Sequence, residues 1–125
     1  MEPITVLVIE EGAEAALVCA ALAKKPEVRV VDAPDVARAL KRLKTGQQQV
    51  AVAIVGASGL ARSADLVKKL QPRGIPIIGL VHDLAPAAKQ RALAAGVREI
   101  HERPTRWQPY SELIDSLISR FITPN

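Results

Sequence analysis

The sequence has few cysteines and aromatic residues, and it lacks a long apolar run. Its 125 residues include one Cys and one each of Trp, Tyr and Phe. A single cysteine excludes an internal disulfide and a cysteine-based metal cluster. No apolar run approaches the ~20 residues that a membrane-spanning helix needs, and the opening Met-Glu-Pro has no basic segment of a signal peptide. We therefore expect a cytoplasmic protein that does not enter a membrane.

The sequence also lacks a concentrated block of charge. Lys and Arg number 17 against 13 Asp and Glu, which gives a net charge of +4. The basic residues are scattered, and no aromatic side chains lie among them to stack on bases. We therefore do not expect this chain to bind nucleic acid.

The sequence does contain regular aliphatic patterns. Apolar residues make up 49% of the chain, enough for a single domain over residues 1–125 with an aliphatic core. Short β-branched runs alternate with segments of helical spacing. The expected strands are 4–9, 28–31, 50–55, 75–81 and 97–101. The expected helices are 13–25, a segment from Pro34 to Gly46, a short helix capped by Ser63, Pro86 to Ala95, and a last helix opened by Pro109.

This alternation predicts the fold class. Strands that are apolar throughout need both faces covered, which predicts a parallel sheet with helices on each side. Five β-α units favour a doubly wound, flavodoxin-like α/β fold. Ligands of such sheets bind beyond the carboxyl ends of the strands. The candidate functional residues are those that end the strands: Glu10, Glu11, Gly56, Val81, His82 and Arg103.

Three segments carry motifs at these strand ends. Val6–Glu11 reads VLVIEE, a strand followed by an acidic pair. Ile75–Asp83 reads IPIIGLVHD, and Ala92–Pro104 reads ALAAGVREIHERP, with Ala-Gly, a short strand and a basic-Pro pair. Together they resemble the receiver domain of bacterial response regulators, the CheY-like family, over nearly the whole chain. The resemblance implies a (βα)5 fold with strand order 2-1-3-4-5 and a role in two-component signal transduction.

The same resemblance implies a set of site positions. In receivers two acidic residues help to hold Mg²⁺, an Asp after the third strand accepts a phosphoryl group, and a Thr or Ser and a Lys contact that group. The acidic pair falls on Glu10 and Glu11, each one methylene longer than Asp. The acceptor position falls on Gly56, the hydroxyl position on Val81 and the Lys position on Arg103. Neither Gly nor Val supplies the group that this chemistry needs.

These departures indicate a pseudo-receiver, a degenerate receiver that lacks the phosphoacceptor Asp. We expect no catalytic residue, no enzyme activity and no cofactor, with weak Mg²⁺ binding at most because one metal-binding carboxylate is missing. We expect Glu10, Glu11 and Arg103 to form a charge cluster in which Arg103 bridges one Glu. His82 and His101 lack a third ligand, so we expect no metal site there.

The resemblance also implies a surface for partners. Receivers dimerise and contact their outputs through the face of the fourth helix, fifth strand and fifth helix. The family's switch aromatic aligns with Ile100, and Trp107 falls in the expected loop before the last helix, near Tyr110. Aromatic residues are enriched at interface hot spots. Ile100, Trp107 and Tyr110 therefore mark a candidate face for a protein partner or self-association, with Trp107 either an anchor for the partner or a local plug.

Two other functions remain open. The first is a receiver phosphorylated at a non-standard site, either Asp65 or Asp83. If the alignment shifts by one residue, the acceptor position moves from Gly56 to Val55, which has no carboxylate either. The second alternative is a small nucleotide-binding domain that uses the Gly56–Gly59 loop. That loop follows a strand and precedes a helix, as phosphate-binding glycine loops do.

Overall fold

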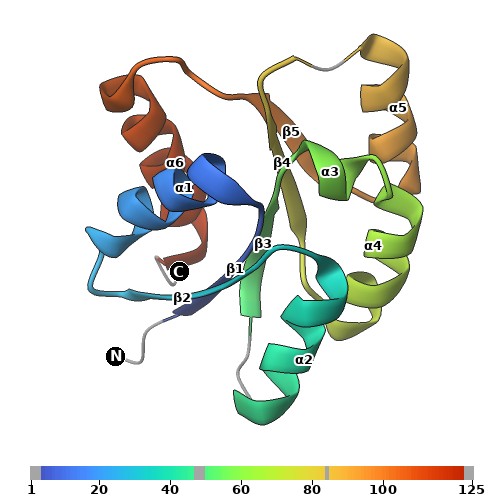
Figure 1. Cartoon of the computed structure of the whole chain (residues 1–125), viewed down its shortest axis with the longest axis horizontal. Helices are drawn as coiled ribbons and strands as arrows, with labels where there is room; N and C mark the ends of the chain where they lie inside the picture. Colours follow the sequence, from blue (N-terminus) through green and yellow to red (C-terminus); the bar gives the residue numbers. More distant parts are fainter. Residues whose placement is uncertain (1–3, 47–49, 84, 123–125) are drawn as a thin grey trace.

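The computed structural model of the chain describes residues 4–46, 50–83 and 85–122, so the terminal Met-Glu-Pro and Thr-Pro-Asn segments lie outside the described residues. The strands are β1 (Ile4–Ile9), β2 (Val28–Ala33), β3 (Val50–Val55), β4 (Ile77–Val81) and β5 (Glu99–Glu102). The helices are α1 (Gly12–Ala23), α2 (Val36–Gly46), α3 (Ala57–Leu60), α4 (Ser63–Leu70), α5 (Pro86–Ala95) and α6 (Trp107–Ile122), and a 3-10 turn η1 (Gln71–Arg73) follows α4. Strands and helices alternate along the chain (Figure 1).

The five strands form one parallel sheet in the order β2-β1-β3-β4-β5. This confirms the expected doubly wound, flavodoxin-like fold with order 2-1-3-4-5. The direction in which strands are added reverses at β1, which pairs with β2 on one side and β3 on the other. The carboxyl ends of β1 and β3 therefore lie side by side, with Ile9 opposite Val55. In open α/β sheets this reversal point is where ligands bind.

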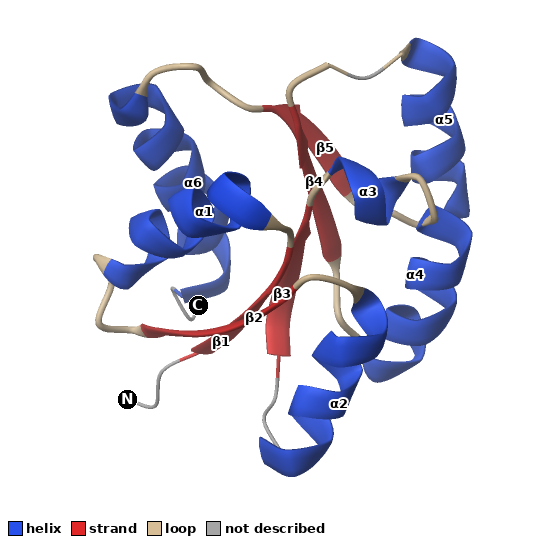
Figure 2. Ribbon diagram, viewed as in Figure 1, coloured by secondary structure: helices blue, strands red, loops and turns tan. Residues whose placement is uncertain are grey.

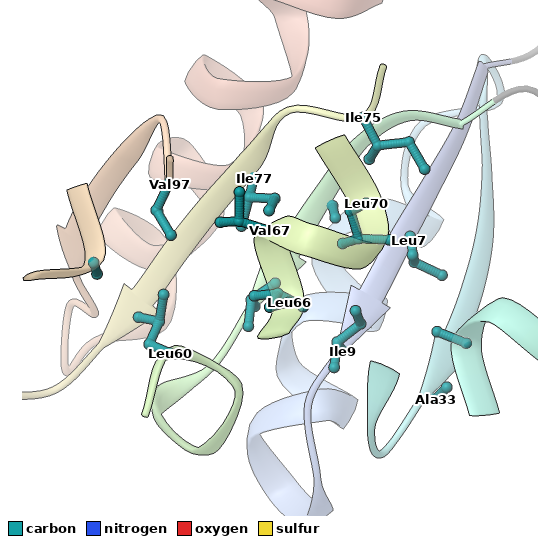
Figure 3. Close-up of a cluster of buried hydrophobic side chains, with 14 of the residues drawn as sticks. Leu7, Ile9, Ala33, Leu60, Leu66, Val67, Leu70, Ile75, Ile77 and Val97 are labelled. Atoms are coloured by element: carbon teal, nitrogen blue, oxygen red, sulfur yellow. The ribbon is translucent and has the colours of Figure 1, made fainter. Parts of the chain in front are cut away.

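Successive strand residues point to opposite faces of the sheet, and each face builds its own core. Helices α1 and α6 cover one face, and α2, α4 and α5 cover the other (Figure 2). The α1/α6 side buries these residues: Val6, Val8, Val18, Ala21, Leu22, Val52, Ile54, Ile78, Leu80, Tyr110, Ile114, Leu117 and Ile118. Leu7, Ile9, Leu66, Leu70 and Ile77 belong to the core on the opposite side (Figure 3). Both cores are almost entirely aliphatic, as the composition predicts.

Most expected elements are confirmed within a few residues. The strands 4–9 and 50–55 and the helix Pro86–Ala95 have the expected bounds. Gly96 ends α5 with φ of 125°, a conformation that glycine adopts without strain. The strand expected over 28–31 extends to Ala33, and β4 begins at Ile77 instead of residue 75.

Two details of the expected helices are wrong. The last helix begins at Trp107, so this residue lies in a helix and not in a loop. Pro109 is tolerated as its third residue because the first four N–H groups of a helix have no intrahelical partner. The short helix after β3 is divided into α3 and α4, and Ser63 is the first residue of α4 instead of its cap. Arg62 takes the cap position, without a side-chain hydrogen bond.

The lengths and hydropathies of the helices bear on membrane association. Over the described residues, no helix combines the length and the apolar character that crossing a bilayer requires.

The burial of Ile114, on α6, gives a first testable prediction. Ile114 is fully buried, with 0% of its surface exposed, whereas Leu93 on α5 is 39% exposed. Ile114→Ala should lower the free energy of unfolding by about 2–5 kcal/mol, because it removes buried methyl groups and leaves a cavity. Leu93→Ala is the control and should change it by about 0.5 kcal/mol or less. Urea unfolding measures both, and equal losses would contradict the assignment of this core.

The link between β5 and α6 gives a prediction of pH dependence. Arg120 donates two hydrogen bonds to the Glu99 carboxylate, at 2.7 and 2.9 Å. These bonds lower the pKa of Glu99 to about 2. The stabilisation is therefore present above the ordinary carboxyl pKa of ~4.3 and is lost as the pH falls through about 2. Glu99→Gln should reduce stability at neutral pH and have little effect near pH 2, measured by urea unfolding. An equal loss at both pH values would exclude this ion pair as the cause.

Candidate functional site

The sheet brings four of the predicted site positions to one edge. Backbone hydrogen bonds continue the pairing just beyond the strands, from Gly56 N–H to Ile9 C=O at 3.1 Å and from Arg103 N–H to Val81 C=O at 2.7 Å. Glu10 follows β1 directly. The residues that end β1, β3, β4 and β5 are thus held together by the same ladder that forms the sheet.

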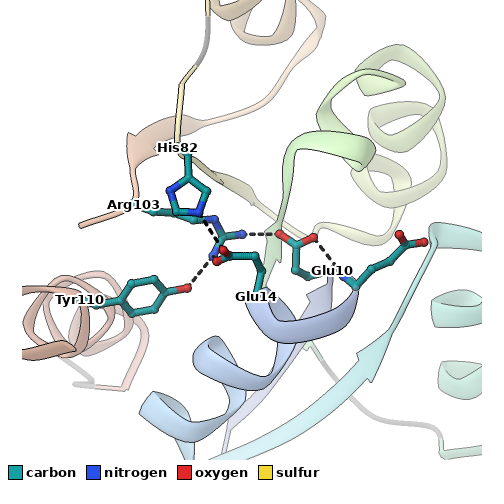
Figure 4. A network of polar contacts seen from close by, with 6 residues as sticks. Glu10, Glu14, His82, Arg103 and Tyr110 are labelled. Atoms are coloured by element: carbon teal, nitrogen blue, oxygen red, sulfur yellow. Dashed lines mark hydrogen bonds and ion pairs between the residues drawn. The ribbon is translucent and has the colours of Figure 1, made fainter. Parts of the chain in front are cut away.

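Arg103 is the centre of the site (Figure 4). Its guanidinium forms an ion pair and hydrogen bond with Glu10, and it lies 3.2 Å from Glu14 Oε2. It also donates a hydrogen bond of 2.5 Å to the Tyr110 hydroxyl. The Arg103 side chain is 2% exposed and that of Glu10 is 10% exposed. A buried cation is thus surrounded by two carboxylates and a phenol, as buried charges require.

Gly56 determines where the Glu10 carboxylate lies. A Cβ atom at position 56 would lie 1.7 Å from Glu10 Oε2 and 2.2 Å from its Cδ. The Glu10 carboxylate therefore occupies the space that any side chain at position 56 would need. The same carboxylate accepts a hydrogen bond of 3.0 Å from the Glu11 N–H, which fixes its second oxygen.

The structure places the side chains of the predicted acidic pair, Glu10 and Glu11, in different surroundings. The Glu11 side chain is exposed and lies outside the Arg103 cluster, which Glu11 contacts through its backbone N–H. It lines a cavity of about 260 Å³ together with Asp35, Ser58, Arg62 and Asp65. The expected charge cluster therefore contains Glu10 and Arg103, with Glu14 in place of Glu11. The cavity includes part of the Gly56–Gly59 loop, but three carboxylates and one guanidinium line it, so a nucleotide phosphate would meet net negative charge.

Glu14 was not predicted as part of the site, whereas His82 is one of the candidate residues at the strand ends. His82 Nε2 lies 2.7 Å from Glu14 Oε1, so the cluster extends from Arg103 through Glu14 to β4 (Figure 4). The sequence does carry a signal for Glu14, since it is the one charged residue within α1. It lies in the first turn of that helix, next to the carboxyl edge of the sheet.

Val81 and Tyr110 complete the surroundings of the site. Val81 is buried in the core on the α2/α4/α5 side and has no hydroxyl to offer. Burial raises the pKa of the Tyr110 hydroxyl, although the nearby Arg103 cation opposes the increase. Tyr110 therefore remains a neutral phenol that accepts from Arg103.

These residues do not fit a bound Mg²⁺ ion. The Glu10 carboxylate is already paired with the Arg103 guanidinium, and Gly56 supplies no carboxylate. Among the described residues, no group of three or more His, Cys, Asp or Glu side chains is placed to hold a metal. A divalent cation prefers several oxygen ligands, and one carboxylate already paired with a guanidinium is a poor substitute.

The candidate partner residues do not share one surface. Ile100 is half-buried and packs on the α2/α4/α5 side of the sheet. Tyr110 is 3% exposed and lies on the α1/α6 side. Trp107 is 40% exposed, stacks on Tyr110 with ring centroids 6.2 Å apart, and lies under the Lys24 ammonium at 4.9 Å. Of the three, Trp107 is the most exposed, and it lies beside the end of α1.

Comparison with solved structures identifies the fold. The phosphorylated cyanobacterial phytochrome response regulator RcpA matches 97% of this chain and 95% of its own, with a TM-score of 0.81 and 13% identity. The response regulator domain of Thermotoga maritima CheB matches 99% of each chain, with a TM-score of 0.73 and 16% identity. A response regulator from Hahella chejuensis matches 98% of this chain and 97% of its own, with a TM-score of 0.74 and 19% identity.

At these identities the matches establish the receiver, or CheY-like, fold. The sequence matches no family model and no curated protein.

The buried ion pair gives a prediction about stability. Arg103→Met leaves the Glu10 carboxylate buried without a cation and should lower the free energy of unfolding by about 3–5 kcal/mol. Arg98→Met, at an exposed arginine, is the matched control and should change it by about 0.5 kcal/mol or less. Adding Glu10→Gln to Arg103→Met should recover part of the loss, because it removes the unpaired charge. Urea unfolding tests all three, and additive losses would contradict a direct pairing.

Proposed function

We propose that this chain is a receiver-like signalling module of two-component systems that works through protein contacts and without phosphorylation. It is a binding module, not an enzyme, and we expect it to act in the cytoplasm. The observation that carries the proposal is the position of the Glu10 carboxylate, which fills the space of the missing side chain at Gly56 and pairs with Arg103.

The chemistry of the site supports this function. Phosphoryl transfer to a receiver needs a carboxylate nucleophile, a metal to neutralise charge and a cation to pair with the product. Here the cation at the centre, Arg103, is already paired with Glu10 and close to Glu14. A phosphoryl group would have no acceptor at position 56 and would have to displace an internal carboxylate.

In this proposal the ion pair between Glu10 and Arg103 takes the place of the phosphoryl group. In a phosphorylated receiver, an anion beside the third strand attracts the basic residue after the fifth strand. Glu10 supplies a carboxylate of the protein itself in that position, and Arg103 links it to Tyr110 on α6. We infer that one arrangement of the β5–α6 segment is held at all times, and that the protein presents a fixed surface to its partner.

The test is incubation with Mg²⁺ and acetyl phosphate, followed by intact-mass measurement. We expect no phosphoryl adduct on the natural chain, whereas a receiver with an acceptor Asp should be labelled in the same tube. The matched variant Glu10→Asp/Gly56→Asp/Arg103→Lys introduces an acceptor Asp, an acidic residue short enough to leave room for it and a Lys, and it is expected to gain labelling. An adduct on the natural chain, mapped to Asp65 or Asp83, would support the alternative of a non-standard phosphorylation site instead.

A further inference from the structure

Exposed basic residues without an acidic partner gather on one side of the sheet, on the layer formed by α2, α4 and α5 (Figure 2). Neither α2 nor α5 contains an Asp or Glu, and α4 contains one, Asp65. Five exposed cations of this layer, which includes the turn η1, form no ion pair with any described residue: Lys41, Lys68, Arg73, Lys89 and Arg91. We call these five residues the basic face.

The acidic side chains of this layer are already paired with other cations. Asp65 lies 3.3 Å from Lys69, one turn further along α4. Asp35, at the start of α2, accepts a hydrogen bond of 2.8 Å from the Arg38 N–H and lies 3.7 Å from the Arg38 guanidinium. We leave Arg62 out of the basic face because it lines the cavity that holds acidic side chains. The charge of the basic face is therefore not neutralised by the layer that carries it.

The cations packed against α1 and α6 are, by contrast, largely neutralised within the protein. Lys25 lies 3.4 Å from Asp115, and Arg120 pairs with Glu99. Arg103 is enclosed by two carboxylates. The net charge of +4 is therefore concentrated on the α2, α4 and α5 side of the molecule.

Two lysines of the basic face lie on the side of their helix that is opposite the core. Successive residues of a helix are about 100° apart around its axis, so two residues correspond to about 200°. Lys41 lies two residues from each of the buried Ala39 and Leu43. Lys68 likewise lies two residues after the buried Leu66. Both ammonium groups are thus available to a partner that covers this layer.

The three helices form one continuous surface. The first residues of α2 and α4 line the same cavity, with Val36 from one helix and Leu66 from the other. Helices α4 and α5 pack against each other, and a Cβ atom at Gly96, which ends α5, would lie 2.7 Å from the Val67 side chain on α4. The basic face is spread over neighbouring helices and does not surround a cleft. This arrangement suits an extended polyanion better than a small ligand.

The charge distribution is that of a nucleic-acid-binding surface. The sequence pI is about 9.6, and cations clustered on one face of such a basic domain are the electrostatic footprint of nucleic-acid binding. Along the chain these residues are scattered, which is why we expected no nucleic acid, but the fold collects them. A duplex carries about one negative charge per 1.7 Å of its axis, so it can meet cations that are spread over a surface.

The positions of the aromatic and large apolar residues favour a duplex over other partners. Single strands bind by stacking their bases on aromatic rings, and the three aromatic residues, Trp107, Tyr110 and Phe121, all belong to α6 on the other side. The bases of a duplex are covered and need no such rings. A protein partner normally needs a cluster of apolar anchors, and Leu93 is the one large apolar side chain exposed on the described part of this layer.

We propose that the basic face binds the phosphate backbone of a nucleic-acid duplex without reading its sequence. The contacts are ion pairs between phosphates and the Lys and Arg side chains, which position a protein on a duplex and carry no base information. This inference goes beyond the proposed function and uses no residue of the Arg103 cluster. DNA and RNA duplexes share this backbone chemistry, so the experiment includes both.

Fluorescence anisotropy of a labelled DNA duplex of about 20 base pairs, titrated with the intact chain at several salt concentrations, tests the proposal. Binding should be saturable at low salt. With four or five phosphate contacts, the affinity should fall by about a few hundredfold between 50 and 200 mM salt. A labelled RNA duplex in a parallel titration shows which of the two duplexes is bound more tightly.

A pair of double variants separates the basic face from net charge. Lys41→Gln/Lys68→Gln should weaken duplex binding by about tenfold or more and reduce the salt slope by about two. Lys24→Gln/Arg106→Gln removes the same charge from exposed positions at the end of α1 and before α6, and it should bind like the natural chain. Circular dichroism should show the same helix content in both variants.

Three results would overturn the proposal. One is the absence of duplex binding at low salt, and another is an equal loss of affinity in the two double variants. The third is tighter binding of poly-L-glutamate than of either duplex, which would assign the basic face to an acidic protein. An adduct in the phosphodonor experiment would refute the proposed function and leave these results unchanged.

Amide NMR shifts provide a second readout that requires no substitution. Titration with the DNA duplex should shift the signals of α2, α4 and α5, including those of Lys41, Lys68 and Lys89. The signals of α1 and α6 should stay in place. Shifts confined to α1 and α6 would contradict the assignment of the surface.

Discussion

The ion pair between Arg103 and Glu10 is the interaction on which the carboxyl edge of this protein depends. It joins the residue after β5 to the residue after β1, across the ends of β3 and β4. Tyr110 extends the link to α6, and Glu14 and His82 extend it to α1 and β4. An ion pair this deeply buried adds little net stability compared with an apolar core, because both charges must leave water. Its role is to fix one arrangement of the five segments.

This arrangement shows how the receiver fold accommodates a buried ion pair at its carboxyl edge. The strands, the two helix layers and the basic residue before Pro104 are all present, and the Glu10 carboxylate lies in the space that a side chain at Gly56 would need. The fold by itself does not specify a function, which depends on the residues at its site and on its surfaces.

The fold could be predicted from the sequence because the pattern that specifies it is local and recurs in each β-α unit. The strands β1 and β3 are runs of apolar residues apart from Thr5, the helices α2 and α4 have an apolar stripe, and Pro86 and Gly96 stand at the two ends of α5. The site was only partly predictable. Their positions at the strand ends identified Glu10, Gly56 and Arg103 as candidate site residues. An ion pair between Arg103 and one Glu was also expected. The direction in which Glu11 turns, the inclusion of Glu14 and the burial of Tyr110 depend on side-chain packing between distant segments, which periodicity does not encode.

The glycine at position 56 limits which substitutions this site accepts. An aspartate introduced there by a single change would meet the Glu10 carboxylate, since even a Cβ atom would lie 1.7 Å from Glu10 Oε2. Two carboxylates would then compete for one guanidinium. Shortening or removing Glu10 first opens the space, and only after that step does an acidic residue fit. Any route to an acidic residue at position 56 is therefore ordered, and its first step is a change at Glu10, beyond the end of the neighbouring strand.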